Sequence, residues 1–429
     1  MNKEYILLVV LAAVFILPMI TPANATWWNI SWSYKEPCYI NTTSPGSLTD
    51  FPVLCTMNTT ALISTGKMND TCKDLRVLSS IENLILSYEI ENNTCNTSYT
   101  NIWIKIPATT ANANDTVYIY YGNNAATDAQ NKIGVWSNGY RGVWHFANDT
   151  IDSLNGIAAT TNANITKFLN STVCHSYTCI NVTGYTYWTA AFIPPVIGPF
   201  GESAWATTYD NATRQSMAGT YTANYKGGFG IELAVPAGTH QWDWSGGTLA
   251  GSSGPAAAFI ISNNAWFYIA GITNGRYNRT LYYNGTSRAN NTADGGTTLP
   301  SNNLALLSTN YSALRSPWKG LVDEFRLHNV TRNEYWFQGE WGQTFSFGSE
   351  QSAPPNTCTI TNNSMWLVTC SDNCTINGGA YNVTNVTTTG TGFLTFNNTN
   401  FTFNTFFLGS GCKIAINTSN SRFMRSPYS

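Results

Sequence analysis

Charge is scarce in this sequence. Charged residues make up only 10% of the 429 residues, against about 25% in an average soluble protein. The 21 Lys and Arg residues never gather into a basic run, and the formal net charge is -2. Because binding to nucleic acid or anionic lipid depends on clustered cations, the sequence predicts no nucleic-acid partner. With so little charge, another kind of group must hydrate the surface.

Long apolar runs are also scarce. The longest is Ile6–Ile20, which follows the positive start Met1–Lys3. At about 15 residues it is shorter than the roughly 20 that span a bilayer. The pattern Ala23-Asn24-Ala25 is typical of a signal-peptidase site. We therefore predict a signal peptide over residues 1–25, no transmembrane segment after its cleavage, and a secreted or cell-surface location.

Motifs for metal, phosphate or nucleophilic chemistry are missing. The sequence has no Cys-x-x-Cys pair, Gly-x-Ser-x-Gly elbow, Walker loop or Rossmann fingerprint, and its four His show no ligand spacing. Hydrolysis of a glycosidic bond needs two carboxylates close together, but Asp323 and Glu324 are adjacent in a predicted strand, so we expect them to point to opposite faces. We therefore predict no enzyme, no catalytic residues and no cofactor.

Ten cysteines fall into three clusters, each with an even number of members. This pattern predicts disulfides closed within each domain in an oxidising compartment. Spacing alone does not choose the pairing in the four-residue clusters, although we favour the local pairs Cys38 with Cys55 and Cys72 with Cys95. The clusters are Cys38, Cys55, Cys72 and Cys95; Cys174 and Cys179; and Cys358, Cys370, Cys374 and Cys412.

Sequons for N-glycosylation are abundant. After the predicted leader the chain carries 24 Asn-x-Ser/Thr triplets, about twice the number expected from composition. Glycans would supply the missing surface hydration; a host without Asn glycosylation, whose codons favour Asn and Thr, is the alternative. Examples are Asn29, Asn41, Asn58, Asn92, Asn114, Asn148, Asn181, Asn211, Asn284, Asn310, Asn329, Asn382 and Asn400.

Period-two alternation dominates the chain and predicts an all-β fold of antiparallel sheets. Ile102, Ile104 and Ile106, for example, share one face of a predicted strand. One short helix is expected where Thr331 and Glu334 form a capping box.

Composition suggests where the domains end. We predict a β-domain over residues 26–138, a Gly- and Trp-rich domain over 139–351, a linker at 352–356 that contains two prolines, and a small disulfide-containing β-domain over 357–429.

The first domain resembles a β-domain of secreted prokaryotic proteins known as domain of unknown function 2341. The segments that carry the resemblance include Trp28–Lys35, Asp50–Leu54, Asp74–Val77, Ile102–Pro107 and Ile119–Asn123. The resemblance implies an extracellular, often multi-domain protein and no established activity.

The second domain resembles the concanavalin A-like lectin/glucanase superfamily, especially its laminin-G-like branch. Gly142–Phe146, Trp266–Ala270, Leu281–Gly285 and Gly320–Leu327 carry the resemblance, while Glu202 is unusual for the family. It implies a two-sheet jelly-roll sandwich that binds ligands on a concave sheet or rim loops. The tail resembles the first rungs of a parallel β-helix; a small disulfide-closed β-domain is the alternative.

Two sets of residues are candidates for binding. Asp323 is expected on the face of Phe325 and Leu327, hydrogen-bonded to backbone amides; the alternative is a calcium site that it forms with Asp149 and Asp152.

Trp242 and Trp244 share a strand face, and we expect them to be buried in the sandwich core; the alternative is that, with His240, they are exposed and stack on sugar rings.

These patterns together predict an exported glycoprotein that binds a glycan or a cell-surface protein without catalysis. One alternative is a purely structural envelope component. The second is a polysaccharide-degrading enzyme, because acids far apart in the sequence can still meet in space. The observation that would favour the enzyme is a pair of carboxylates about 5 to 9.5 Å apart in an open groove.

Overall fold

The computed structural model divides into two compact units, Asn29–Asn356 and Thr357–Ser429. The predicted leader lies outside the described residues. Those residues are 27–161, 166–183, 188–190, 199–213, 215–221, 228–234, 241–247, 256–258, 261–274, 278–292, 304–306, 317–353, 357–417 and 421–425.

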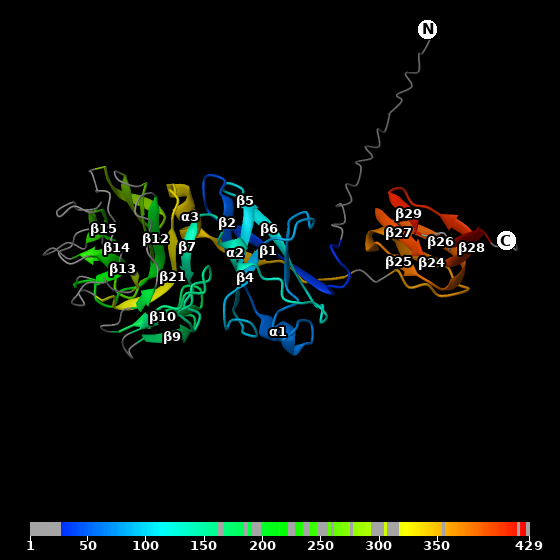
Figure 1. The fold of residues 1–429 in the computed structure, drawn as a ribbon, viewed down its shortest axis with the longest axis horizontal. Coiled ribbons are helices and arrows are strands. Elements are labelled where there is room, and N and C mark those ends of the chain that lie inside the picture. Colours follow the sequence, from blue (N-terminus) through cyan, green and yellow to red (C-terminus); the bar gives the residue numbers. More distant parts are fainter. Residues whose placement is uncertain are drawn as a thin grey trace, which may run out of the picture. The chain divides into compact units, whose positions relative to one another are not determined.

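The first unit begins with a domain of two antiparallel sheets, which we call the N-terminal domain (Figure 1). One sheet has the order β22-β1-β6-β3 with β23 also on β1, and the other has the order β2-β5-β4. The bounds are β1 (Tyr34–Asn41), β2 (Thr49–Met57), α1 (Thr59–Ser64), β3 (Arg76–Ser79), β4 (Tyr88–Ile90), β5 (Thr100–Ala108), β6 (Asn114–Tyr121), α2 (Lys132–Val135), β22 (Thr344–Phe347) and β23 (Gln351–Ser352).

The alternation seen in the sequence places the apolar face of each strand between these sheets. Ile40 of β1, Val53 of β2 and Ile119 of β6 are fully buried there. The disulfide Cys38–Cys55 joins β1 to β2 and therefore ties the two sheets together. The second expected pair, Cys72–Cys95, also forms.

The chain leaves the N-terminal domain after α2 and returns to it through β22 and β23. Both strands pair antiparallel with β1, and Ala353 N donates to Ser33 O at 2.8 Å. Residues 344–352 therefore complete the sheet of the N-terminal domain. The sequence-based boundary at 351 had assigned all but the last of them to the second domain. Sequence periodicity could not show this, because it identifies a strand without naming the strand that pairs with it.

The middle part, which we call the sandwich domain, packs two larger antiparallel sheets face to face. One has the order β19-β18-β17-β12-β21-β10-β9 with β7 also on β21, and the other β16-β15-β14-β13-β20-β11-β8. The bounds are β7 (Tyr140–Trp144), β8 (Thr160–Thr161), β9 (Thr166–Asn170), β10 (Thr178–Val182), β11 (Trp188–Ala190), β12 (Phe200–Ala206), β13 (Gln215–Tyr221), β14 (Gly228–Ala234), β15 (Gln241–Gly247), β16 (Ala256–Ala258), β17 (Phe267–Thr273), β18 (Arg279–Tyr283), β19 (Thr286–Asn291), β20 (Leu304–Leu306) and β21 (Gly320–His328).

The sheet that contains β12, β17 and β21 is buried on both faces. One face packs against the second sheet of the sandwich through residues such as Ala204 and Phe325. The other face contributes Tyr268 and Ala270 to the core of the N-terminal domain, together with Trp336 of α3 (Glu334–Gly342) (Figure 1). The two domains therefore share one hydrophobic core.

Helix α3 begins where the sequence predicted a helix but has a different cap. The side chain of Asn333 accepts a hydrogen bond from Trp336 N at 3.1 Å, so Asn333 is the N-cap in place of Thr331. Asn and Thr are both good caps, and the structure uses the one immediately before the first helical residue.

The second unit is a short parallel solenoid, as the resemblance to β-helix rungs predicted. Two parallel sheets, β24-β26-β28-β30 and β25-β27-β29, enclose a core that includes Phe396 and Phe401. Thr375 pairs with Thr395 one rung later. The bounds are β24 (Trp366–Thr369), a 3-10 turn (Cys370–Asp372), β25 (Thr375–Asn377), β26 (Ala380–Thr389), β27 (Gly392–Asn397), β28 (Asn400–Phe407), β29 (Cys412–Asn417) and β30 (Arg422–Arg425).

All ten cysteines are paired, as the even clusters predicted. The solenoid is closed by Cys358–Cys374 and Cys370–Cys412, and Cys174–Cys179 closes a loop in the sandwich domain. In the described part of the chain, no helix has the length and apolar character needed to cross a membrane.

Candidate functional site

A β-bulge in β21 places consecutive acidic residues on one face of the sheet. The pairing of β21 with β12 shifts between Arg326 and Asp323, and Glu324 adopts a left-handed φ of 53°. Phe325 and Leu327 remain in the sandwich core, whereas Asp323 and Glu324 lie on the opposite face, where they bond Ser176 and His145.

Two sequence-based expectations about this strand were therefore wrong. Asp323 does not share the face of Phe325 and Leu327, and Asp323 and Glu324 do not point to opposite faces. Strict alternation fails at a bulge, because one extra residue on the bulged strand reverses the order of faces.

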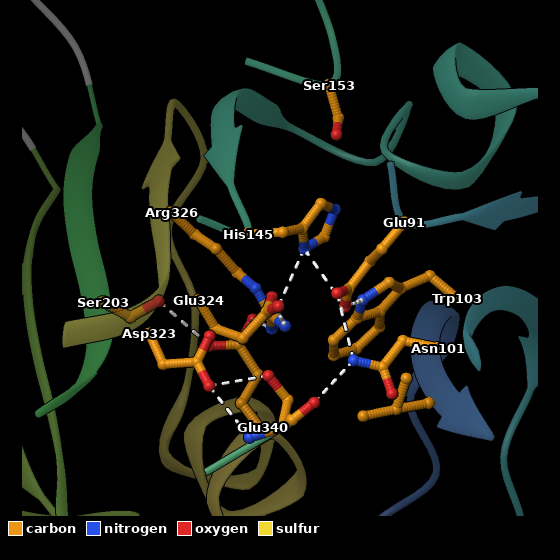
Figure 2. A network of polar contacts seen from close by, with 12 residues as sticks. Glu91, Asn101, Trp103, His145, Ser153, Ser203, Asp323, Glu324, Arg326 and Glu340 are labelled. Carbon is orange, nitrogen blue, oxygen red and sulfur yellow. Dashed lines mark hydrogen bonds and ion pairs between the residues drawn. The ribbon is translucent and has the colours of Figure 1, made fainter. Parts of the chain in front are cut away.

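His145 of the segment after β7 is the centre of a buried polar network (Figure 2). Its Nδ1 lies 2.7 Å from Glu324 Oε1 and 3.7 Å from Glu91 Oε1. Its Nε2 lies 3.4 Å from Glu89 Oε2. Glu89 and Glu91 come from the N-terminal domain, so the network joins the two domains.

The two glutamates of the N-terminal domain are held by several donors. Glu91 accepts hydrogen bonds from Trp103 Nε1 at 2.8 Å and from Asn101 Nδ2 at 3.0 Å. Glu89 accepts from Trp136 Nε1 at 2.6 Å and from Ser153 Oγ at 2.7 Å. Indole and amide donors fix these carboxylates in place and offset the loss of water.

Arg326 links the network to α3. Its guanidinium donates to Glu324 Oε2 at 2.9 Å and to Glu340 Oε1 at 3.1 Å, and lies over the ring of Trp103 at 4.6 Å. Glu340 also accepts from the hydroxyls of Tyr140 and Tyr268. A planar guanidinium suits this position because it can bond two carboxylates and stack on an indole at the same time.

The carboxylates of the network fall into two groups by pKa. Burial raises the pKa of Glu91 to about 7, and it raises the pKa of Asp323 well above its usual range. Although burial opposes ionisation of Glu89 and Glu340 too, His145 lowers the pKa of Glu89 and Arg326 that of Glu340, each to about 2. Glu91 and Asp323 are therefore the members that tend to hold protons.

The charge of His145 follows from the same contacts. Burial disfavours the charged imidazole, but Glu324 and then Glu89 raise the pKa of His145 well above its ordinary value. The pKa of Glu324 is in turn lowered by His145 and Arg326 against the effect of burial. His145 is therefore a charged imidazolium that bridges Glu324 of the sandwich domain and Glu89 of the N-terminal domain.

A pocket of about 530 Å³ opens onto the edge of this network. His175 stacks on Trp205 in its wall, with ring centroids 3.6 Å apart and planes 17° from parallel. Glu324 and Arg326 supply charged groups at its inner end, although each is only 3% exposed. The residues that line the pocket include Trp103, His175, Tyr177, Trp205, Glu324 and Arg326.

The predicted calcium ligands do not come together. Asp152 accepts from the backbone amides of Val143 and Asn155, both at 2.8 Å, and Asp149 accepts from Asn92 Nδ2 at 2.7 Å. Asp323 Oδ2 accepts from the backbone amide of Ser176 at 2.8 Å. None of the three belongs to a group of three possible metal ligands among the described residues.

The three candidates for stacking on sugar rings are Trp242, Trp244 and His240, and the structure describes none of their side chains. Trp242 and Trp244 lie on β15, opposite Leu233 and Ile231 of β14, but their side chains are outside the described part of the structure. His240 lies outside the described residues as well.

Sequence reasoning missed the residues that form the network and the pocket. Glu89 and Glu91 are two residues apart at the end of β4, which puts them on one face, but their partners Trp103 and Glu324 lie on β5 and on β21 of the other domain, and no spacing in the sequence relates those. One signal was present: in a chain with only 10% charged residues, an acidic residue within an otherwise apolar strand requires a buried partner.

Two other constellations lack the geometry for chemistry. Ser203 Oγ contacts His328 Nε2 at 3.1 Å, but Glu340 bonds the serine, and among the described residues Nδ1 of His328 has no partner. All three are buried, and burial lowers the pKa of His328 to about 3, so it is a poor base. Cys358 and Cys374 lie near Asp372 but form a disulfide, which removes their thiolates.

Family models match two parts of the chain in the predicted order. Residues 71–157 match the Domain of unknown function (DUF2341), and residues 183–336 match the Concanavalin A-like lectin/glucanases superfamily. Along a chain whose sheets are described above, a match to DUF2341 therefore precedes a match to the concanavalin A-like superfamily. This confirms both resemblances seen in the sequence. No curated protein matches the chain.

Solved structures with similar folds are distant. Domain 4 of AbnA, an extracellular GH43 arabinanase from Geobacillus stearothermophilus solved with arabinotriose, is 16% identical, with coverage of 47% of this chain and 98% of that one and a TM-score of 0.38. The binding domain of botulinum neurotoxin serotype D is 8% identical (47% and 51% covered, TM-score 0.37), so the chain spans about half of that structure. The Ruminococcus gnavus sialidase CBM40 bound to α2,3-sialyllactose is 13% identical (34% and 84% covered, TM-score 0.28). Nothing about this chain follows from these similarities, because all three TM-scores lie below 0.5.

Proposed function

We propose that the protein is an exported, non-catalytic binding protein that takes a carbohydrate in the pocket between the N-terminal and sandwich domains. The observation that carries the proposal is the composition of that pocket. The Trp205 and His175 rings form a stacked wall, and Glu324 and Arg326 lie at the inner end. Sugar rings present C–H faces that stack on aromatic side chains and hydroxyls that bond charged groups.

Export and glycosylation belong to the same proposal. Each of the 12 described example sequons, from Asn29 to Asn400, has an asparagine that is at least partly exposed; Asn310 lies outside the described residues. Five disulfides suit an oxidising compartment. The glycans would supply the hydration that so few charged residues cannot provide.

A glycan array with the full chain and one pocket variant tests the binding. We expect binding of a restricted set of glycans by the wild type and at least a tenfold loss in Trp205→Ala, because the stacking surface is removed. Trp341→Ala is the matched control, since Trp341 is 41% exposed and does not line the pocket. Equal loss in both variants, or no ligand for the wild type, would contradict the proposal and favour a structural envelope protein.

One observation favours hydrolysis as a second candidate. The nearest carboxylate oxygens of Glu91 and Glu324 lie within 4.8 Å of each other, and one pKa is raised while the other is lowered, as in an acid and nucleophile pair. Glu91, however, does not line the pocket and is bonded by Trp103 and Asn101. We therefore propose binding without cleavage. Release of reducing sugar by the wild type but not by Glu324→Gln would reverse that choice.

A further inference from the structure

Glu91, His145 and Glu324 lie close enough together to be ligands of a single metal ion. One atom from each lies within 4.8 Å of the other two, and all three side chains are buried. They come from the end of β4, from the segment after β7 and from the bulge of β21. Figure 2 shows the ring of His145 between the two carboxylates, with one nitrogen directed at both.

We propose that Glu91, His145 and Glu324 bind a divalent transition-metal cation, such as Zn²⁺, with one imidazole and two carboxylate ligands. The metal would replace the proton that now lies between Nδ1 of His145 and Oε1 of Glu324, which are 2.7 Å apart. Imidazole nitrogen and carboxylate oxygen are both donors that Zn²⁺ accepts, and three protein ligands leave the fourth position of a tetrahedral site open. This goes beyond the proposed function and does not depend on carbohydrate binding.

The surroundings of His145 support a ligand role. A histidine that binds a metal through one nitrogen usually donates its other N–H to a carboxylate, which orients the ring. Here Nε2 faces Glu89 Oε2 at 3.4 Å, and Glu89 is itself fixed by Trp136 and Ser153. Glu89 is therefore a positioning residue for the proposed site.

An unpartnered carboxylate oxygen is the second, independent observation. Asp323 is fully buried next to Glu324, and its Oδ1 has no hydrogen-bond partner among the described residues, while Oδ2 is held by Ser176. A buried oxygen without a donor is costly unless positive charge lies nearby. A cation bound by Glu324 would lie next to this oxygen, whereas the neighbouring cation Arg326 already bonds Glu324 and Glu340.

The pocket provides a route to the site. Glu324 lines the pocket, so an ion that enters from solvent meets one of the three ligands there, and the other two lie within 4.8 Å of it. The Oε2 oxygen of Glu324 stays on Arg326, which leaves Oε1 for the metal.

Cobalt binding to the full chain, stripped of metal with a chelator, tests the proposal. Co²⁺ replaces Zn²⁺ in such sites and absorbs visible light when bound in low-symmetry coordination. We expect one equivalent of Co²⁺ per chain with visible absorption bands, displacement by Zn²⁺, and a higher Tm when either ion is added. Absence of all three effects at 100 μM metal would overturn the proposal and leave His145 as a bridging imidazolium.

Variants locate the site. Glu91→Gln and His145→Gln should abolish the absorption bands, and Glu89→Gln should weaken binding about 10- to 100-fold, as expected for a group that orients a ligand. Glu340→Gln is the matched control, a buried carboxylate on Arg326 outside the three ligands, and should keep the bands. Binding that survives both Glu91→Gln and His145→Gln would overturn the assignment. If one of these variants does not fold, the other variant and the Tm shift of the wild type still decide the question.

Discussion

Glu202 is a carboxylic acid in the core of the sandwich domain. It lies on β12 midway between Phe200 and Ala204, which pack in the sandwich core. Glu202 is fully buried, and neither of its carboxylate oxygens has a hydrogen-bond partner among the described residues. Burial raises the pKa of Glu202 well above its usual range, and the nearby backbone of Ile231 offsets this only in part. The folded protein therefore keeps a proton that the unfolded chain releases near pH 4.5.

This difference predicts how stability depends on pH. Below pH 4.5 both states are protonated at Glu202, so the group has no effect. As pH rises above that value the unfolded state loses the proton first, and the free energy of unfolding falls by up to about 1.4 kcal/mol per pH unit.

Glu202→Gln should therefore stabilise the protein at pH 7 and not at pH 4. Urea unfolding of both proteins at pH 4, 5.5 and 7 measures the difference directly. A constant difference across this range would contradict the raised pKa.

At the same scale, the sequence identified Glu202 as unusual but could not show that it is fully buried in the core of the sandwich domain. It also placed Asp323 and Glu324 on opposite faces, because alternation is the default for consecutive residues in a strand. A left-handed residue at a bulge is not encoded by any spacing, and Glu is not a residue type that favours this conformation. The network around His145 could therefore not be predicted from sequence.

At the scale of elements, α3 depends on its N-cap. Asn333 bonds the amide of Trp336, whereas Thr331 is exposed and outside the helix. Asn333→Ala should lower the free energy of unfolding by about 1 kcal/mol, and Thr331→Ala should change it by less than about 0.5 kcal/mol. Thermal unfolding of the two variants checks this. Equal effects would show that the predicted capping box contributes as much as the observed cap.

The disulfides should differ in their effect on stability. Cys370–Cys412 closes a separation of 42 residues and Cys174–Cys179 one of only 5. Loop-closure entropy then gives losses of about 4 and about 2 kcal/mol, respectively, when each pair is replaced by Ser.

Limited proteolysis of the two double-serine variants compares their losses of stability. We expect rapid cleavage within residues 357–425 for the first variant and little change for the second. Resistance of the solenoid in the first variant would contradict the estimate.

Strands and cysteine pairs were the elements that the sequence predicted best. The pairs Cys38–Cys55 and Cys72–Cys95 are the local ones that we favoured, although spacing alone did not choose them, and the solenoid agrees with the resemblance to β-helix rungs. The partners of β22 and β23 did not follow, because pairing across more than 300 residues leaves no local trace in the sequence.

At the scale of the whole molecule, the N-terminal and sandwich domains should unfold together. Tyr268 and Ala270 of β17 pack in the core of the N-terminal domain, and Glu91 faces His145 across the boundary. Expression of residues 139–343 alone would expose this apolar face, take Glu89 and Glu91 away from His145, and take the rings of Trp103 and Trp136 away from Arg326.

We therefore expect residues 139–343 alone to be insoluble or partly folded, and residues 27–353 to unfold in a single calorimetric transition. Calorimetry of the longer fragment and heteronuclear NMR of the shorter one are the measurements. A well-dispersed spectrum for residues 139–343 would show that the shared core is dispensable.

The return of the chain through β22 and β23 has a mechanical consequence. The first strand of the unit, β1, pairs with the last one, β23, and Tyr34 lies opposite Ser352. If the unit is stretched between its two ends, tension acts first on this antiparallel pair, which separates one residue at a time from the loaded end. The sandwich domain lies behind that pair and carries no load until β23 and β22 have peeled away from β1.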